Sequence, residues 1–115
     1  MLFLVKAEYV EVGALMPPEA TASYVERAVI PSVEMLAQWE QEGRIRAGGT
    51  FPGERAGAFV MEADSAEEVG QLLGSLPFWG QMKWDVRALQ SISATVERER
   101  GILERAQAML GQSGS

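Results

Sequence analysis

The hydrophobic pattern of this chain switches repeatedly between a two-residue period and a helical period, and the order of these switches restricts the fold. Residues 2–9 mix apolar and β-branched residues with charges at every second position near the end, which is typical of a half-buried strand. Residues 19–42 then carry apolar side chains at helical spacing up to Gly43. Because Pro31 removes a backbone hydrogen bond inside this helix, we expect a kink or two abutting helices there.

The second half of the pattern repeats strand and helix signals. Residues 44–51 and 56–63 are β-like runs joined by the turn-rich segment PGER, which predicts a hairpin. Asp64 or Ser65 is expected to cap a helix that Pro77 ends. Alternation resumes over residues 82–89. The order βαββαβ predicts a ferredoxin-like α+β sandwich over residues 1–90.

Residues 91–115 are expected to form a separate element after the ferredoxin-like unit. A broken heptad pattern predicts an amphipathic C-terminal helix that packs on its own subunit or on a neighbour. Gly101 and the short length argue against an independent coiled coil, and the final GQSGS is expected to fray. The apolar seam consists of Ile92, Val96, Leu103, Ala106 and Leu110, interrupted by Glu99.

Composition excludes several classes of function. The 115 residues, 47% of them hydrophobic, suffice for one compact domain. A net charge of −6 opposes binding to nucleic acid or to anionic membranes. The absence of cysteine and histidine excludes thiolate and imidazole chemistry, so catalysis must use carboxylates, lysine, tyrosine or arginine. The N-terminus resembles neither a signal peptide nor a membrane span, which predicts a soluble cytoplasmic protein.

Three segments carry a resemblance to a known family. They are MLFLVKAEYV, QEGRIRAGGTFPGERAGAFVMEADSAEEVGQLLGSLP and FWGQMKWDVRAL, which together span roughly residues 1–90. In these segments the chain resembles the muconolactone isomerase family. The resemblance implies a ferredoxin-like subunit whose sheet packs on that of a partner, so that a homodimer or larger homo-oligomer forms a dimeric α+β barrel. It also implies an isomerase that moves a proton within a small unsaturated lactone without metal or organic cofactor.

One position departs from the family pattern. The family's opening typically carries a histidine where this chain has Leu4, whereas the lysine two residues later is matched by Lys6. We therefore expect a small substrate other than muconolactone, such as a different lactone, an enol or a polyketide-like ring. An isomerase or cyclase acting on a lactone or enolisable carbonyl compound is the first functional hypothesis. A non-catalytic ligand-binding or accessory protein of the same fold is the alternative.

Strand alternation locates the candidate site residues. If Phe3 and Val5 lie beneath the helices, Lys6 and Glu8 face the opposite side of the sheet, where Asp85 and Arg87 are also expected. Proton transfer next to a carbonyl needs a base, a group that stabilises the enolate oxygen, and a cation for a substrate carboxylate. We assign Lys6, Glu8 and Asp85 as catalytic candidates, and Arg46 and Arg87 as anion anchors. The alternative is a salt-bridged solvated face or dimer contact.

Two aromatic side chains follow Pro77 on the segment that enters the last strand. Phe78 and Trp79 can form an apolar lid over the pocket and thereby bind substrate. The competing interpretation is that they fill the corner between helix and strand, or a subunit interface, because large aromatic residues are mostly buried as packing.

Overall fold

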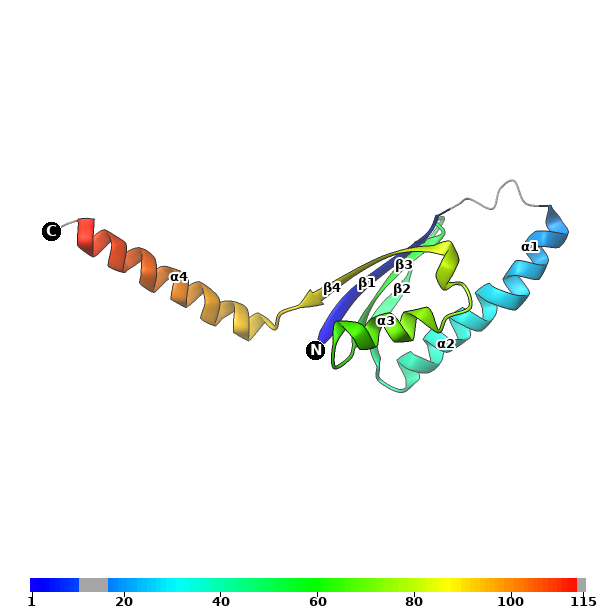
Figure 1. The fold of residues 1–115 in the computed structure, drawn as a ribbon, viewed down its shortest axis with the longest axis horizontal. Helices are drawn as coiled ribbons and strands as arrows, with labels where there is room; N and C mark the ends of the chain where they lie inside the picture. The colour runs from blue at the N-terminus through cyan, green and yellow to red at the C-terminus, as the bar shows by residue number, and fades with distance from the viewer. Residues whose placement is uncertain (11–16, 114–115) are drawn as a thin grey trace.

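The computed structural model describes residues 1–10 and 17–113. Part of the loop expected after the first strand, and the last two residues of the expected frayed tail, lie outside these described residues. Four strands form one antiparallel sheet in the order β2-β3-β1-β4. The strands are β1 (Leu2–Tyr9), β2 (Ile45–Thr50), β3 (Ala56–Glu62) and β4 (Met82–Leu89). This is the predicted ferredoxin-like arrangement, with the first and last strands side by side (Figure 1).

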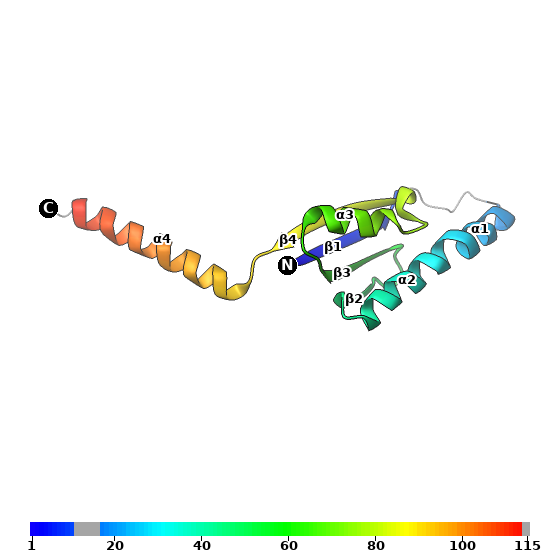
Figure 2. The ribbon, with the colours of Figure 1, turned by 60° about the horizontal axis from the view of Figure 1, so that its bottom comes forward.

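Helices cover one face of the sheet. The helical elements are α1 (Pro18–Tyr24), the π-helix η2 (Val25–Val29), α2 (Ile30–Gln41), α3 (Ala66–Gly74), the short 3₁₀ helix η3 (Trp79–Gln81) and α4 (Ile92–Ser113). Figure 2 shows α2 and α3 alongside the sheet, while α4 points away from it. Side chains from α2 and α3 complete the core with those of the strands, among them Trp39, Val69 and Leu73.

The helical run before the hairpin accommodates Pro31 without a loop. In the π-helical segment η2, the Ile30 N–H reaches back five residues to the Val25 carbonyl. The Ser32 hydroxyl then donates to the Ala28 carbonyl at 2.6 Å. The expected interruption is therefore a local widening of the helix, and α1, η2 and α2 follow one another directly.

The helix α3 ends earlier than the sequence pattern predicted. Ser65 is the N-cap, and its hydroxyl accepts from the Glu68 N–H at 3.1 Å. The helix then stops at Gly74, with Ser75 as C-cap, so that two residues, Ser75 and Leu76, separate the helix from Pro77. Those residues and η3 form the turn that leads into β4.

The C-terminal helix lies outside the compact body. Figures 1 and 2 both show α4 leaving the end of β4 and extending into solvent. The principal extents of the molecule are 77 × 31 × 24 Å, and its radius of gyration is 20.6 Å, against about 13 Å for a compact chain of this size. Among the described residues, α4 makes no extensive contact with any other element. It includes Ser113, so the helix continues into the segment expected to fray.

Candidate functional site

The side of the sheet without helices is set by the alternation of β1. Phe3 and Val5 are 1% and 0% exposed beneath the helices, so the side chains between and after them point the other way. Lys6 and Glu8 are accordingly exposed. The predicted assignment of β1 residues to the two faces is therefore confirmed. On β4 the same alternation leaves Met82 and Trp84 half-buried, but Val86 is 39% exposed on this edge strand.

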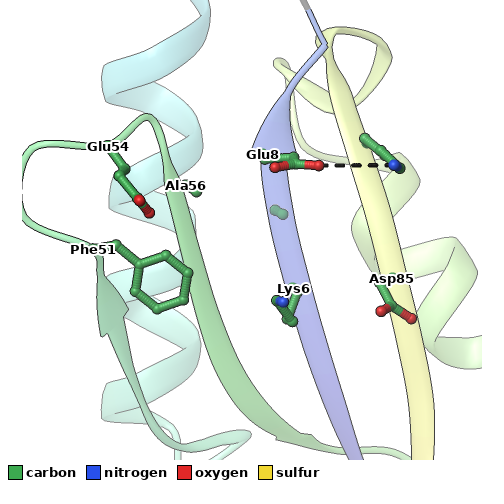
Figure 3. A pocket seen from close by; sticks show the side chains of 8 residues that line it. Lys6, Glu8, Phe51, Glu54, Ala56 and Asp85 are labelled. Atoms are coloured by element: carbon green, nitrogen blue, oxygen red, sulfur yellow. Dashed lines mark ion pairs between the residues drawn. The ribbon is translucent and has the colours of Figure 1, made fainter.

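The pairing of β1 with β4 brings charged residues of opposite sign together. Lys6 is directly opposite Asp85, and Glu8 is directly opposite Lys83. Opposed residues on one face of an antiparallel pair have Cβ atoms about 5 Å apart, within reach of polar side chains. Figure 3 shows Lys6 and Glu8 on β1 and Asp85 on the neighbouring β4, with the loop between β2 and β3 across from them.

A groove of about 320 Å³ lies between these strands and the β2–β3 loop. That loop supplies Phe51 and Glu54 to its wall. The turn is closed by a hydrogen bond from the Phe51 N–H to the Ala56 carbonyl at 2.9 Å, and Gly53 adopts a φ of 79°, which other residues rarely do. The lining residues are Lys6, Ala7, Glu8, Phe51, Glu54, Ala56, Lys83 and Asp85.

The charges of the groove are unequally paired. Lys83 Nζ lies 3.9 Å from Glu8 Oε1, and Arg87 Nε lies 3.3 Å from Asp85 Oδ1. Within the described part of the chain, Lys6 and Glu54 have no ion-pair partner. One ammonium group and one carboxylate are therefore free to contact a bound molecule, and the aromatic ring of Phe51 gives the groove an apolar wall.

The structure brings only some of the predicted site residues together. Lys6, Glu8 and Asp85 all line the groove. Arg87 is on the same face and contacts Asp85, but it does not line the groove. Arg46 contacts Glu62 and lines a different, more open depression at the β2 side of the sheet.

The aromatic pair after Pro77 does not line the groove either. Phe78 is 5% exposed in the core on the helix side, and its N–H donates to the buried Ser32 hydroxyl at 3.0 Å. The buried position of Phe78 agrees with the interpretation that this side chain serves as packing and not as a lid. Trp79 is 50% exposed in η3, where its carbonyl accepts from Trp84 Nε1 at 3.1 Å.

Phe78 belongs to an aromatic cluster on the helix-covered side. The ring of Tyr9 lies edge-on to Tyr24 and to Phe78, at centroid distances of 6.3 and 6.2 Å, and Arg55 lies 5.6 Å over the Tyr9 ring. Burial raises the pKa of Tyr9 to about 12; the neighbouring Tyr24 adds to this shift and Arg55 opposes it. Burial also raises the pKa of Tyr24, whose Oη is buried without a hydrogen-bond partner among the described residues.

Besides two alanines, three residues that line the groove were absent from the predicted site. Lys83 was predictable, because alternation places it on the face of Lys6 and antiparallel pairing sets it against Glu8. Phe51 and Glu54 depend on the conformation of the hairpin loop, which strand periodicity does not specify. Among the described residues, no group of three or more His, Cys, Asp or Glu side chains is placed to hold a metal ion. None of the described helices has the length and apolar character needed to cross a membrane.

Comparison with known proteins places the fold in a family. The family model described as muconolactone delta-isomerase matches residues 1–94. The chain belongs to the muconolactone delta-isomerase family. A comparison with curated proteins gave no match.

Two solved structures resemble this member of the muconolactone delta-isomerase family. The crystal structure of muconolactone isomerase is 27% identical, with a TM-score of 0.63, covering 79% of this chain and 90% of that chain. The second is 5-chloro-2-hydroxyhydroquinone dehydrochlorinase (TftG) from Burkholderia phenoliruptrix AC1100, in complex with 2,5-dihydroxybenzoquinone. It is 20% identical with a TM-score of 0.55, and the match covers 82% of this chain and 98% of that chain. The second likeness concerns the fold alone.

Proposed function

We propose that this protein is a cofactor-independent isomerase or cyclase that moves a proton within a small lactone or another enolisable carbonyl compound. Its family membership supports a reaction of this kind. The observation that carries the proposal is the position of Lys6, whose ammonium group lies in the groove beside carboxylates and has no ion-pair partner among the described residues. The substrate is proposed to bind in this groove, against the ring of Phe51.

The proposed reaction transfers one proton and leaves the atoms of the substrate otherwise unchanged. A carboxylate removes a proton from the carbon next to the carbonyl, and the electron pair of the broken C–H bond moves onto the carbonyl oxygen. Lys6 donates a hydrogen bond to the resulting enolate oxygen. The protonated carboxyl then returns the proton to a conjugated carbon, which shifts the double bond.

The residues of the groove take distinct roles in this proposal. Glu8 and Asp85 are the predicted bases, and Glu54 joins them because it lines the groove without an ion-pair partner in the described chain. Arg87 can turn from Asp85 toward a substrate carboxylate. Arg46, Phe78 and Trp79 have no role in this groove, since none of them lines it.

A second copy of the chain is proposed to cover the open sheet face. Leu2 is 38% exposed there, and its neighbours Leu4 and Val60 are half-buried. Packing this face against the same face of another copy gives a dimeric α+β barrel, and it excludes water from the groove, which strengthens electrostatic contacts with the enolate. Light scattering should show at least a dimer at micromolar concentration, with a lower mass for Leu4→Glu. A monomer throughout that range contradicts the barrel.

Replacing Lys6 with methionine tests the catalytic proposal. The aliphatic length is kept, so the fold should persist, while turnover should fall about 10²–10³-fold through loss of one transition-state contact. The assay follows hydrogen–deuterium exchange by NMR in a panel of unsaturated lactones and enolisable rings. Lys83→Met is the matched control, because Lys83 lines the same groove but is paired with Glu8, and its loss should have a much smaller effect. Equal turnover by wild type and Lys6→Met refutes the assigned role.

The non-catalytic alternative makes a different prediction in the same assay. Glu8 and Asp85 each have a cationic partner, which favours a groove that binds without reacting. In that case panel compounds shift the NMR signals of groove residues in the wild type, and Lys6→Met abolishes the shifts, but no compound exchanges its protons. Exchange catalysed by the wild type excludes this alternative.

A further inference from the structure

The outer helix α4 exposes apolar side chains in a regular row. Ile92 is 84% exposed, Leu103 is 56% exposed and Leu110 is 72% exposed, although such residues are normally buried. Val96 is also exposed, and Ala106 continues the row toward the C-terminus. Among the described residues, no other element packs extensively on this helix. The apolar row therefore remains uncovered in a single copy of the chain.

The spacing of this row fits another helix. The row residues recur at alternating intervals of four and three along the 22 residues of α4, which is the a/d seam of a coiled coil, and Glu99 occupies one seam position. Only Ile92 falls within residues 1–94, which match the family model, and Val96 already lies beyond them. The seam therefore extends well beyond the region shared with the family, and it calls for an explanation apart from the proposed proton transfer.

We propose that α4 is an assembly arm that pairs with α4 of a second copy of this chain in antiparallel orientation. The small residue Ala106 and the charged residue Glu99 in the seam favour the antiparallel orientation over the parallel one. In a parallel pair, Glu99 faces Glu99 of the other copy and Ala106 faces Ala106, which gives one repulsive layer and one underfilled layer.

An antiparallel pair removes both poor layers. The two helices can be aligned so that the numbers of any two facing residues add up to 202. In this alignment Ile92 packs on Leu110 and Val96 packs on Ala106 of the second copy. Glu99 then faces Leu103, with Arg100 of the second copy within one helical turn of its carboxylate. Among the described residues of a single chain, Glu99 forms an ion pair with Arg98 at 3.6 Å, and 60% of the Glu99 side chain is exposed. Ile92, Val96 and Leu110 thus gain apolar partners, Glu99 gains a nearby cation, and Glu99 no longer faces its own copy.

Tethering makes such a short pair of helices possible. A helix of this length with Gly101 in its middle is a weak coiled coil when isolated. This effect rests on the dimer proposed above: when the folded bodies associate through their sheets, the contact between the arms becomes intramolecular, and its effective concentration rises to the millimolar range or above. The arm therefore adds to assembly without requiring a strong isolated helix pair.

Cysteine cross-linking of the full-length chain tests both the pairing and its orientation. The chain contains no cysteine, so each introduced thiol is unique. Under mild oxidation, a mixture of Val96→Cys and Ala106→Cys should give a disulfide-linked dimer, whereas each variant alone should give little. A parallel pair gives the reverse, with each variant cross-linking to itself. The control mixture, Ala94→Cys with Ala108→Cys, has the same residue sum but lies on the outer face of the helix, and it should not cross-link.

A charge placed in the seam provides the second measurement. Leu103→Glu should weaken arm pairing by about 10- to 100-fold in dissociation constant, through loss of apolar burial in both copies. Ala108→Glu adds the same charge to the outer face and should leave assembly unchanged. Far-UV circular dichroism checks that both variants keep the helix, and the turnover of both should match the wild type because α4 does not line the groove. Equal dissociation constants for the two variants, or no cross-link in the Val96→Cys and Ala106→Cys mixture, overturn the proposal.

Discussion

The two faces of the sheet are built from alternate residues of the same strands, yet they differ in almost every property. On the helix side, Phe3, Val5 and Met61 are at most 1% exposed. On the other side, Lys6, Glu8 and Asp85 are exposed and charged. The covered face stabilises the fold by apolar burial, while the open face keeps polar groups available for binding. Stability and the proposed chemistry should therefore respond to different substitutions, even between adjacent residues.

The largest expected difference is between neighbours on β1. Phe3→Ala leaves a cavity in the core and should lower the free energy of unfolding by about 3–5 kcal/mol. Leu4→Ala, one residue later on the open face, should cost clearly less, because Leu4 is already half-exposed. Urea denaturation at one protein concentration measures both. Similar losses for the two variants would show that the open face is as tightly covered as the core.

The next largest loss of stability is expected from removing a buried hydroxyl group. Ser32 is 0% exposed, donates to the Ala28 carbonyl and accepts from the Phe78 N–H. Ser32→Ala leaves the Phe78 N–H buried without its partner and should cost about 1–3 kcal/mol. The control is Ser75→Ala, whose exposed hydroxyl also donates to a helix carbonyl at 2.6 Å. Its loss should lie within about 0.5 kcal/mol, because water replaces the bond. Equal costs in urea denaturation would contradict the assigned role of burial.

The fold was predictable because its signals are local and mutually consistent. The periodicity of β1 and β4 set both their bounds and their faces, and the element order then placed them side by side, bringing Lys6 opposite Asp85. The position of Phe78 was not predictable, since it depends on a hydrogen bond to Ser32, 46 residues earlier in the chain. No local pattern encodes a contact of that range.

The candidate site was predictable only where it lies on strands. Lys6, Glu8 and Asp85 follow from alternation, whereas Glu54 enters the groove through the conformation of a loop. Arg46 was assigned by residue type and strand position, but a register shift in β2 between Ile45 and Ala47 and the contact with Glu62 hold it elsewhere. The extended position of α4 was left open by its pattern, because an amphipathic helix suits its own core and a second copy equally well.

The aromatic cluster predicts a pH dependence at high pH. The pKa of Tyr9 is raised from 10.0 to about 12 by burial, so above pH 10 the unfolded chain releases a proton that the folded chain retains. The unfolded state then binds fewer protons, and stability should fall as the pH rises from 10 toward 12. Urea midpoints measured across this range should fall less in Tyr9→Phe than in the wild type. The remaining decrease comes from Tyr24, whose pKa is also raised. Identical profiles for the two proteins would show that Tyr9 ionises freely in the folded state.

The smallest effect is expected on the open face. Lys83 and Glu8 lie 3.9 Å apart with side chains 74% and 59% exposed, so Lys83→Met should change the free energy of unfolding by only about 0.2–1 kcal/mol. The effect should disappear in about 1 M salt, where the screening length is about 3 Å. A loss of several kcal/mol that persists in salt would mean that the pair is desolvated even before a substrate binds. A small, screened loss would instead leave the charges of this face free to change partners, which is what Lys6, Glu8 and Asp85 need if they are to bind a substrate.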